Sequence, residues 1–196
     1  MFSELLRTRL GSLVELSSIQ IKQLERHYEL LSRWNRVLNL TTVVKVEEVV
    51  ERHYFESLFL ASHLPAGCLR IADIGSGAGF PGIPIAVVRP ESMVVLIESH
   101  RRKCVFLREA TRGMGNARVL PARAEQVSER FDWAVSRGVS YADLRPLLSR
   151  LAENVGLLAG AGSPPDLRFT WNNPILLPWG KRRFLWIGHS VPRQTR

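Results

Sequence analysis

The sequence predicts an α/β protein in which a doubly wound, mostly parallel sheet follows an all-helical N-terminal segment. Two observations support this prediction. Short apolar runs alternate with helical patterns from residue 70 onward, and the first of these runs leads into a glycine-rich stretch. The first 65 residues, by contrast, show only helical periodicity. We therefore expect a helical cap over residues 1–65 and a ligand-binding sheet domain over residues 66–196.

Length and composition limit the class of protein. A chain of 196 residues with 45% hydrophobic content is large enough for one α/β domain with a small appendage. Cys68 and Cys104 have no C-x-x-C spacing, which is typical of free thiols in a reducing cytosol, so we expect a cytoplasmic protein. Neither a signal peptide nor a membrane span is expected. The net charge of +9 favours a polyanionic partner, although many basic proteins bind none.

The N-terminal segment is expected to form three helices. The first covers Phe2–Leu16, with leucines at helical spacing. Ser17 and Gln20 form a capping box that opens the second helix, whose apolar stripe extends to Leu38. The third covers about Glu47–Leu64.

Strands and helices are expected to alternate in the rest of the chain. Each strand is recognised as a short apolar run and each helix by its caps and its periodicity. The expected strands are Arg70–Ile74, Met93–Glu98, Ala117–Leu120, Phe131–Ser136 and Val155–Leu158, then two closing antiparallel strands, Ile175–Leu177 and Arg183–Ile187. The expected helices are Ile83–Val88, Arg101–Arg112 capped by Ser99, and Leu144–Leu151 capped by Asp143 with Pro146 in its first turn.

The stretch Ile71–Gly82, I-A-D-I-G-S-G-A-G-F-P-G, is the expected ligand site. Gly75, Gly77 and Gly79 are too many glycines for an ordinary turn, and they suit a backbone that a ligand touches. A dinucleotide fold has G-x-G-x-x-G at this place. Here the third glycine comes one residue early and Phe80 occupies the last position of that pattern. The stretch therefore argues against a dinucleotide.

Two acids indicate which ligand fits. Asp73, before the first glycine, would repel a diphosphate but suits a cationic amine. Glu98, at the end of the next strand, is placed to hold a ribose hydroxyl pair. S-adenosylmethionine (SAM) has the amine and the ribose but no phosphate. D-x-G-x-G-x-G after a strand resembles motif I of the Rossmann-like, class I SAM-dependent methyltransferases; the alternative is a purely structural glycine turn.

Further strings resemble a single family. Leu38–Thr42 reads L-N-L-T-T, Arg52–Leu58 contains R-H-x-x-x-S-L, and the glycine stretch continues as F-P-G-I-P. With the later R-P-E, E-S-x-x-R-K, R-A-E and F-D-x-x-x-S-R strings, these cover about three-quarters of the chain. Together they are similar to the RsmG (GidB) family, bacterial 16S rRNA guanine-N7 methyltransferases. The resemblance implies SAM as cofactor and 16S rRNA, in the small ribosomal subunit or its assembly intermediate, as partner; we also expect a monomer.

Site residues follow from the motifs and the resemblance. We expect Arg137, at the end of a strand, to position the methyl acceptor or hold the SAM carboxylate, and Asn39 to help position the acceptor. The alternatives are a surface cation for Arg137, a helix C-cap for Asn39 and, for His53, a core histidine bonded to a backbone carbonyl. No metal site is expected, because the histidines lack metal-ligand spacing. The expected cofactor-binding residues are Asp73, Gly75, Gly77, Phe80, Glu98, Ser99, His100, Ala124, Glu125 and Arg137.

The sequence departs from the family after the fifth strand. The family's lysine-glycine pair is absent, since the chain reads L-L-A-G-A-G-S-P-P, and Asp166–Trp179 is short enough that a helix is expected to be missing. Two other functions therefore stay open. One is a SAM methyltransferase acting on a small molecule or a protein, and the other is a SAM- or RNA-binding homologue that has lost catalysis.

Overall fold

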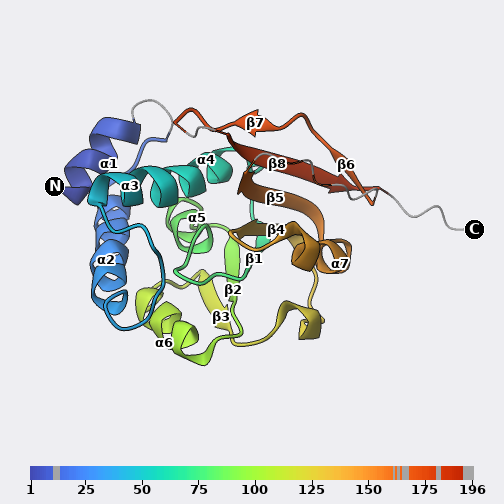
Figure 1. The fold of residues 1–196 in the computed structure, drawn as a ribbon, viewed down its shortest axis with the longest axis horizontal. Helices are drawn as coiled ribbons and strands as arrows, with labels where there is room; N and C mark the ends of the chain where they lie inside the picture. Colours follow the sequence, from blue (N-terminus) through green and yellow to red (C-terminus); the bar gives the residue numbers. More distant parts are fainter. Residues whose placement is uncertain (11–13, 161, 163, 165–167, 180–181, 192–196) are drawn as a thin grey trace, which may run out of the picture.

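In a computed structural model, the described residues are 1–10, 14–160, 162, 164, 168–179 and 182–191. They form one eight-stranded sheet in the order β3-β2-β1-β4-β5-β8-β6, with β7 also paired to β8 (Figure 1). Strands β1 to β5 are parallel, β8 is antiparallel to β5, and β6 and β7 are antiparallel to β8. The strands are β1 Arg70–Ile74, β2 Met93–Ile97, β3 Ala117–Leu120, β4 Phe131–Arg137, β5 Ala152–Gly160, β6 Phe169–Trp171, β7 Ile175–Leu176 and β8 Arg183–Ser190.

Helices cover both faces of this sheet. Period-two alternation sends Ile71 and Val94 to the face covered by the N-terminal helices, α5 and α6, and sends Ala72 and Val95 to the face covered by α7 (Figure 1). The helices are α1 Phe2–Leu10, α2 Ser18–Trp34, α3 Val46–Val49, α4 Glu56–Ser62, α5 Gly82–Val88, α6 Arg101–Ala110 and α7 Tyr141–Leu151, with a π-helical segment Val50–Phe55 joining α3 to α4 and a 3-10 turn at Ala124–Gln126.

The N-terminal helices share their core with the sheet. One cluster of buried hydrophobic residues includes Leu24 of α2, Leu58 of α4, Ile83 of α5 and Phe106 of α6. Polar contacts reinforce this packing: the Trp34 indole N–H donates to Glu109 Oε2 at 2.9 Å. The helices before residue 65 are therefore one layer of the α/β structure.

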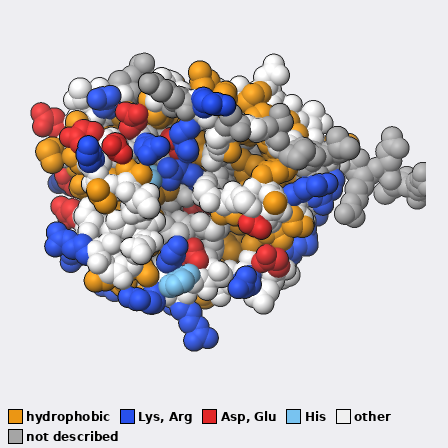
Figure 2. All heavy atoms as spheres, in the orientation of Figure 1, with side chains coloured by type: hydrophobic (Ala, Val, Ile, Leu, Met, Phe, Trp, Pro, Cys, Tyr) orange, Lys and Arg blue, Asp and Glu red, His pale blue; other side chains and the backbone are white. Residues whose placement is uncertain are grey.

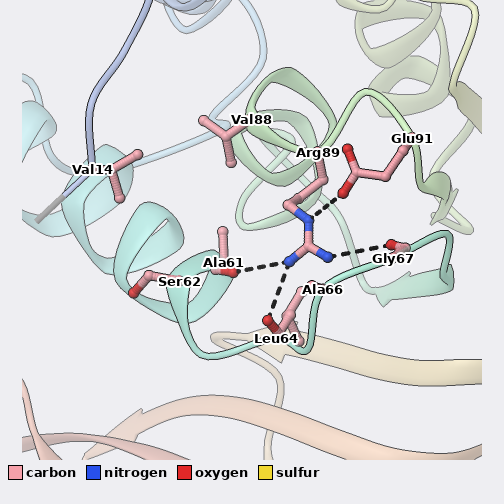
Figure 3. A pocket seen from close by; sticks show the side chains of 9 residues that line it. All are labelled: Val14, Ala61, Ser62, Leu64, Ala66, Gly67, Val88, Arg89 and Glu91. Atoms are coloured by element: carbon pink, nitrogen blue, oxygen red, sulfur yellow. Dashed lines mark hydrogen bonds and ion pairs between the residues drawn. The ribbon is translucent and has the colours of Figure 1, made fainter.

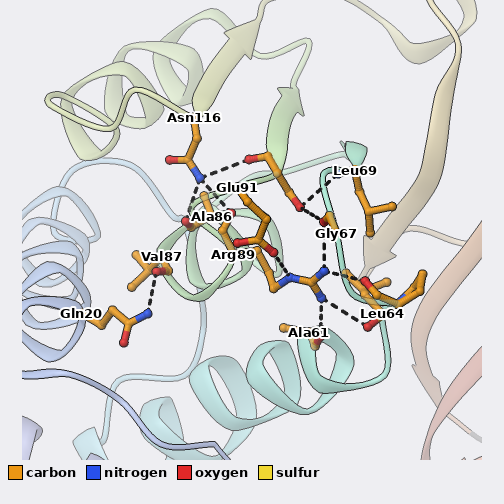
Figure 4. A network of polar contacts seen from close by, with 12 residues as sticks. Gln20, Ala61, Leu64, Gly67, Leu69, Ala86, Val87, Arg89, Glu91 and Asn116 are labelled. Atoms are coloured by element: carbon orange, nitrogen blue, oxygen red, sulfur yellow. Dashed lines mark hydrogen bonds and ion pairs between the residues drawn. The ribbon is translucent and has the colours of Figure 1, made fainter.

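Arg89 ties the end of α4 to the end of α5. Its guanidinium donates to the carbonyl oxygens of Ala61, Leu64, Pro65 and Gly67 and to the Glu91 carboxylate, over distances of 2.5 to 3.5 Å (Figure 4). The last-turn carbonyls of a helix have no partner inside the helix, so a cation placed there satisfies them. Asn116 does the same for the end of α5, where its amide donates to the carbonyls of Ala86, Arg89 and Ser92.

Two predicted helix ends are wrong. The first helix ends at Leu10, and residues 14–17 are not helical; residues 11–13 lie outside the described part of the chain. The second helix has its predicted capping box but ends at Trp34, well before Leu38. Its C-cap is Asn35, whose Oδ1 accepts from the amides of Leu40 and Thr41 at 2.8 and 2.9 Å. This side chain turns the backbone away from the helix, and the interpretation of Asn39 as the C-cap is also wrong.

Two predicted N-caps are wrong as well. His100, not Ser99, caps α6, where its Nδ1 accepts from the Lys103 amide at 3.4 Å. Ser140, not Asp143, caps α7, which consequently begins three residues earlier and carries Pro146 in its interior. Asp143 instead accepts the Ser140 hydroxyl at 2.6 Å.

The strands follow the prediction more closely than the helix ends do. The first five predicted strands and both closing strands are confirmed, although β5 and β8 are longer than expected. The third predicted helix is also confirmed as a helical segment, Val46–Ser62, with the π-helical stretch inside it. Between residues 168 and 179 the structure shows no helix, and the short strand β6, which was not predicted, lies there. None of the described helices is both long and apolar enough for a bilayer span.

Candidate active site

The glycine loop after β1 bends back over the end of β2. The amides of Gly75 and Ser76 both donate to the Ile97 carbonyl, at 2.9 and 3.1 Å. Gly75 has φ +71°, and a Cβ there would lie 2.5 Å from Cγ2 of Val139. Only glycine fits this backbone without displacing its neighbour. The predicted strand, loop and helix arrangement is therefore confirmed.

Asp73 lies beneath the loop, away from its open side. Strand alternation turns its side chain toward α5, where it is fully buried and Oδ2 accepts from the Gly82 amide at 3.1 Å. Burial, with a smaller contribution from the charge of Glu98, raises the pKa of Asp73 to about 7. Asp73 lines neither cavity described below. In this structure it supports the loop.

Glu98 closes the other side of the loop. Its Oε2 accepts from the Gly77 amide at 2.9 Å and its Oε1 from the His100 amide at 2.7 Å. Each carboxylate oxygen can accept more than one hydrogen bond, so the two oxygens retain capacity for ribose hydroxyls. Glu98 thus fixes the loop and also faces the cavity beside it.

A cavity of about 300 Å³ opens beside the loop at the carboxyl ends of β1 and β2. Ligands of doubly wound sheets bind at this position. The predicted residues Glu98, Ser99, Ala124 and Glu125 all line it, although they come from separate segments of the chain. Its other lining residues are Ile74, Gly75, Ile97, Ala122, Arg123, Val139, Asp143, Leu144 and Leu147. His100 is not among them; it is exposed and caps α6.

A second cavity, of about 230 Å³, meets the first at Gly75. The predicted residues Gly77, Phe80 and Arg137 line it. Asn39 does not: it is exposed, and the next two residues in the chain form that part of the wall. The remaining lining residues are Leu40, Thr41, His53, Ser76, Ala78, Lys103 and Gly138.

Two neutral histidines from the N-terminal helices support this second cavity. His27 Nε2 lies 3.0 Å from the Ala78 carbonyl and its Nδ1 lies 3.0 Å from the Tyr54 hydroxyl, so the ring donates to the glycine loop and accepts from tyrosine. Burial lowers the pKa of His27 to about 4. His53 is buried, as expected for a core histidine, and its Nε2 lies 2.8 Å from the Thr41 hydroxyl. Burial and, less strongly, the charge of Arg137 lower its pKa to about 3.

Arg137 is held by a glutamate that the sequence reasoning did not identify. Its Nε donates to Oε2 of Glu56 at 2.9 Å, and the Glu56 side chain is fully buried. Arg183 of β8 donates to both oxygens of the same carboxylate, at 2.5 and 2.8 Å. A single acid within the apolar run Tyr54–Ala61 was the available signal, because buried carboxylates need cationic partners. Figure 2 shows Lys and Arg side chains over the α3–α4 segment, with Asp and Glu side chains beside them.

A third hollow, of about 380 Å³, lies at the opposite edge of the sheet (Figure 3). Its polar wall is Arg89, whose hydrogen bonds to Ala61, Leu64 and Gly67 and ion pair with Glu91 are drawn there. It contains none of the predicted site residues. Within the described part of the chain, no group of three or more His, Cys, Asp or Glu side chains could hold a metal ion.

Solved structures of methyltransferases have folds similar to this one. A predicted O-methyltransferase from Agrobacterium tumefaciens aligns with a TM-score of 0.61 and 20% identity, over 72% of this chain and 82% of that one. A SAM-dependent methyltransferase from Aquifex aeolicus aligns with a TM-score of 0.57 and 16% identity, over 74% and 93%. At such identities the likeness concerns the fold alone. The fold is that of the Rossmann-like SAM-dependent methyltransferases, as predicted.

Sequence comparison defines the family within this class. Residues 20–158 match the model of the GidB family, rRNA small subunit methyltransferase G, and the chain belongs to this family. A ribosomal RNA small subunit methyltransferase G from Halorhodospira halophila is 40% identical over 81% of this chain and 74% of its own length. Its counterpart from Xanthomonas campestris is 48% identical over 53% of this chain and 49% of its own length. The predicted family is therefore confirmed.

Proposed function

We propose that this protein transfers the methyl group of SAM to N7 of a guanine in 16S rRNA. The observation that carries the proposal is the pair of cavities meeting at Gly75, in a chain whose residues 20–158 match the small-subunit rRNA methyltransferase family. One cavity suits the cofactor and the other the acceptor base. The carboxyl edge of the sheet thereby holds both reactants side by side.

The cofactor side consists of residues whose chemistry fits SAM. Glu98 offers carboxylate oxygens to the ribose, and Ser99, Ala124 and Glu125 form the wall where the adenine would lie. Gly75 lets the backbone approach the ligand closely. We assign Gly77 and Phe80 to the methionine end, because they line the cavity beyond Gly75. Asp73 and His100 contribute indirectly, through the loop and through the start of α6.

The chemistry requires positioning rather than proton transfer. When bound, SAM supplies a sulfonium methyl group, and in-line displacement forms the C–N7 bond as the C–S bond breaks and sulfur keeps the electron pair. N7 has a lone pair and no proton to lose, so no general base is needed. The protein's task is to hold N7 in line with the methyl carbon and to fix the surrounding dipoles. Arg137 and, at longer range, Asn39 position the acceptor in this proposal.

We further propose that residues 1–65 act as a functional cap on the sheet domain of residues 66–196. Three cap residues support this: His27 bonds to the glycine loop, Thr41 lines the acceptor cavity, and Glu56 holds Arg137. The acceptor is rRNA in the small subunit or its assembly intermediate, the enzyme acts as a monomer, and the two free cysteines fit a cytoplasmic site of action. The charge of +9 suits such a partner.

The test is transfer of a labelled methyl group from SAM to 16S rRNA that lacks the modification. We expect label in the RNA and strand cleavage at a single guanine after the borohydride and aniline treatment that is specific for N7-methylguanine. Label on a protein or a small molecule would support the second function instead. SAM binding with no transfer to naked rRNA, small subunits or assembly intermediates would indicate a homologue without catalysis.

A further inference from the structure

A buried ion cluster lies at the rim of the acceptor cavity. Glu56, from the start of α4, accepts hydrogen bonds from Arg137 at the end of β4 and from Arg183 at the start of β8. The carboxylate is fully buried, whereas the two arginine side chains are 18% and 27% exposed. The cluster therefore has a closed side at the glutamate and an open side at the guanidinium groups.

The charges in this cluster do not balance. Two guanidinium groups share one carboxylate, so the partly buried group carries a net positive charge. Arg52, exposed on the π-helical segment, adds a third cation. Its charge is near enough to contribute to lowering the pKa values of Arg137 and His53. His53 is neutral, and Lys103 lines the same cavity. A partly buried excess of positive charge is costly unless an anion accompanies it.

The guanidinium groups also have donors to spare. In the described part of the chain, Arg137 donates only through Nε, to Glu56, which leaves four of its five N–H donors for another partner. Arg183 engages Glu56 through Nε and Nη2, so its Nη1 has no partner among the described residues. Two guanidinium groups held by one carboxylate keep several N–H donors close together, and guanidinium groups bind phosphate oxygens bidentately.

We infer that Arg137 and Arg183, oriented by Glu56, form a phosphate-binding site for the acceptor RNA, at the phosphodiester next to the target guanine. This inference rests on the proposed function, because it assigns the cavity at Arg137 to the acceptor. Arg183 is the new binding residue, and Glu56 is a positioning residue that acts through both arginines.

The position of Arg183 favours RNA phosphate over the carboxylate of SAM. In the sheet order β2-β1-β4-β5-β8, the cofactor cavity lies at β1 and β2, whereas Arg183 lies on β8, beyond β4 and β5. Arg183 lines neither cavity, but it shares the Glu56 carboxylate with Arg137, which lines the acceptor cavity and not the cofactor cavity. A second anion beyond the cofactor is what an RNA strand crossing the rim would supply.

The test compares Arg183→Ala with Arg182→Ala in the full chain. Arg182 is the neighbouring, exposed arginine, and the side-chain hydrogen bonds described for Glu56 come from Arg137 and Arg183. Small-subunit RNA binding is measured from 50 to 300 mM salt, together with KM for RNA, kcat and SAM affinity by calorimetry. For Arg183→Ala we expect a rise in RNA KM on the order of tenfold and a salt slope smaller by about 1, with SAM affinity unchanged. Arg182→Ala should keep the parent KM.

Two further variants separate orientation from charge. Arg183→Lys keeps the charge but loses the planar fork, and we expect it to resemble Arg183→Ala in KM. Glu56→Gln keeps the size of the side chain, and it should raise RNA KM without changing SAM affinity, provided that circular dichroism shows the variant folded. If Glu56→Gln does not fold, the comparison of Arg183→Lys with Arg183→Ala tests the role of orientation.

Two results would overturn the inference while leaving the enzyme assignment intact. One is equal loss in Arg182→Ala and Arg183→Ala, which would mean general surface charge. The other is a loss of SAM affinity in Arg183→Ala, which would place the cofactor carboxylate there. If the parent protein transfers no methyl group to 16S rRNA, the proposed function fails instead. The RNA-binding measurements on Arg183→Ala and Arg182→Ala then decide by themselves whether the phosphate site exists.

Discussion

Arginines at the two edges of the sheet are used in opposite ways. At the amino edge, Arg89 donates to four backbone carbonyls and one carboxylate, so its hydrogen-bonding capacity is filled by the protein itself. At the carboxyl edge, Arg137 and Arg183 share one buried glutamate and keep donors unused by the described residues. An arginine whose N–H donors all have protein partners holds structural elements together, whereas a pair of arginines with unused donors is available to bind a ligand. Hydrogen-bond saturation, rather than charge alone, distinguishes the structural edge from the functional edge.

The largest effect is expected at the glycine loop of the functional edge. Gly75→Asp should lower SAM affinity by about a hundredfold or more, because the new side chain meets Val139 and adds negative charge in a left-handed backbone position. Calorimetric titration measures the loss. Gly113→Asp is the matched control, since Gly113 also has positive φ but has open space around it. Unchanged SAM affinity in Gly75→Asp would refute the pocket assignment.

Arg89→Ala should separate the two edges most clearly. It leaves several carbonyls and Glu91 without their cation, and we expect a loss of about 3 kcal/mol in the free energy of unfolding. Methyl transfer per folded molecule should stay at the parent level. Urea unfolding and the transfer assay measure the two quantities. Arg118→Ala, which breaks the exposed pair with Glu129, should cost less than about 1 kcal/mol. A large drop in specific activity in Arg89→Ala would contradict the division into two edges.

Arg137→Ala should show the reverse pattern. We expect kcat to fall by roughly tenfold to a hundredfold, because the acceptor loses its positioning group, while SAM affinity changes by less than about twofold. Steady-state kinetics and calorimetry on the same preparation give both numbers. Equal losses in turnover and in SAM affinity would place Arg137 on the cofactor instead.

The smallest effect concerns pH. The folded-state pKa values of His27 and His53, about 4 and 3, lie below the ordinary 6.5. As pH falls below 6.5 the unfolded chain binds these protons before the folded chain does, so the free energy of unfolding falls. Asp73 acts oppositely, because its pKa is raised to about 7 in the folded state. Its contribution to the free energy of unfolding therefore falls as pH rises from about 4 to 7. Between pH 4.5 and 6 the two histidines outweigh Asp73 by one proton, so for these groups together the free energy of unfolding falls as pH falls.

His27→Gln should therefore flatten this dependence. Without His27, the contributions of His53 and Asp73 to the pH dependence have opposite signs and cancel. The free energy of unfolding should therefore change little between pH 4.5 and 6. Urea unfolding at several pH values measures the slope, and His189→Gln on the surface should keep the parent slope. A parent-like slope in His27→Gln would mean that His27 does not titrate as its burial implies.

The sequence predicted what local patterns encode. Strands β1 to β5 and the glycine loop are set by apolar runs and by backbone positions that only glycine fits, and both signals are local. Glu98, Ala124 and Glu125 could be predicted to lie together, as they do in one cavity wall, because the carboxyl ends of parallel strands converge at one edge. Family strings extended this to Arg137, whose position at the cavity the structure shows.

What the sequence missed depends on tertiary contacts. Glu56 and Arg183 are 127 residues apart, and nothing local pairs them. Asp73 was expected to face the ligand, yet strand alternation turns it beneath α5. The caps at His100 and Ser140 replaced Ser99 and Asp143 because any nearby polar side chain can cap a helix, and the backbone geometry chooses among them.

The most direct test of the account is a titration of the purified protein with SAM and, separately, with NAD. The carboxyl edge holds a glycine loop closed by Glu98 and a cavity walled by Ala124 and Glu125, so we predict saturable binding of SAM and no detectable binding of NAD. The Gly75→Asp variant should lose the SAM signal. Binding of NAD, or no binding of SAM by the folded parent protein, would contradict the assignment of this edge as the methyl-donor site.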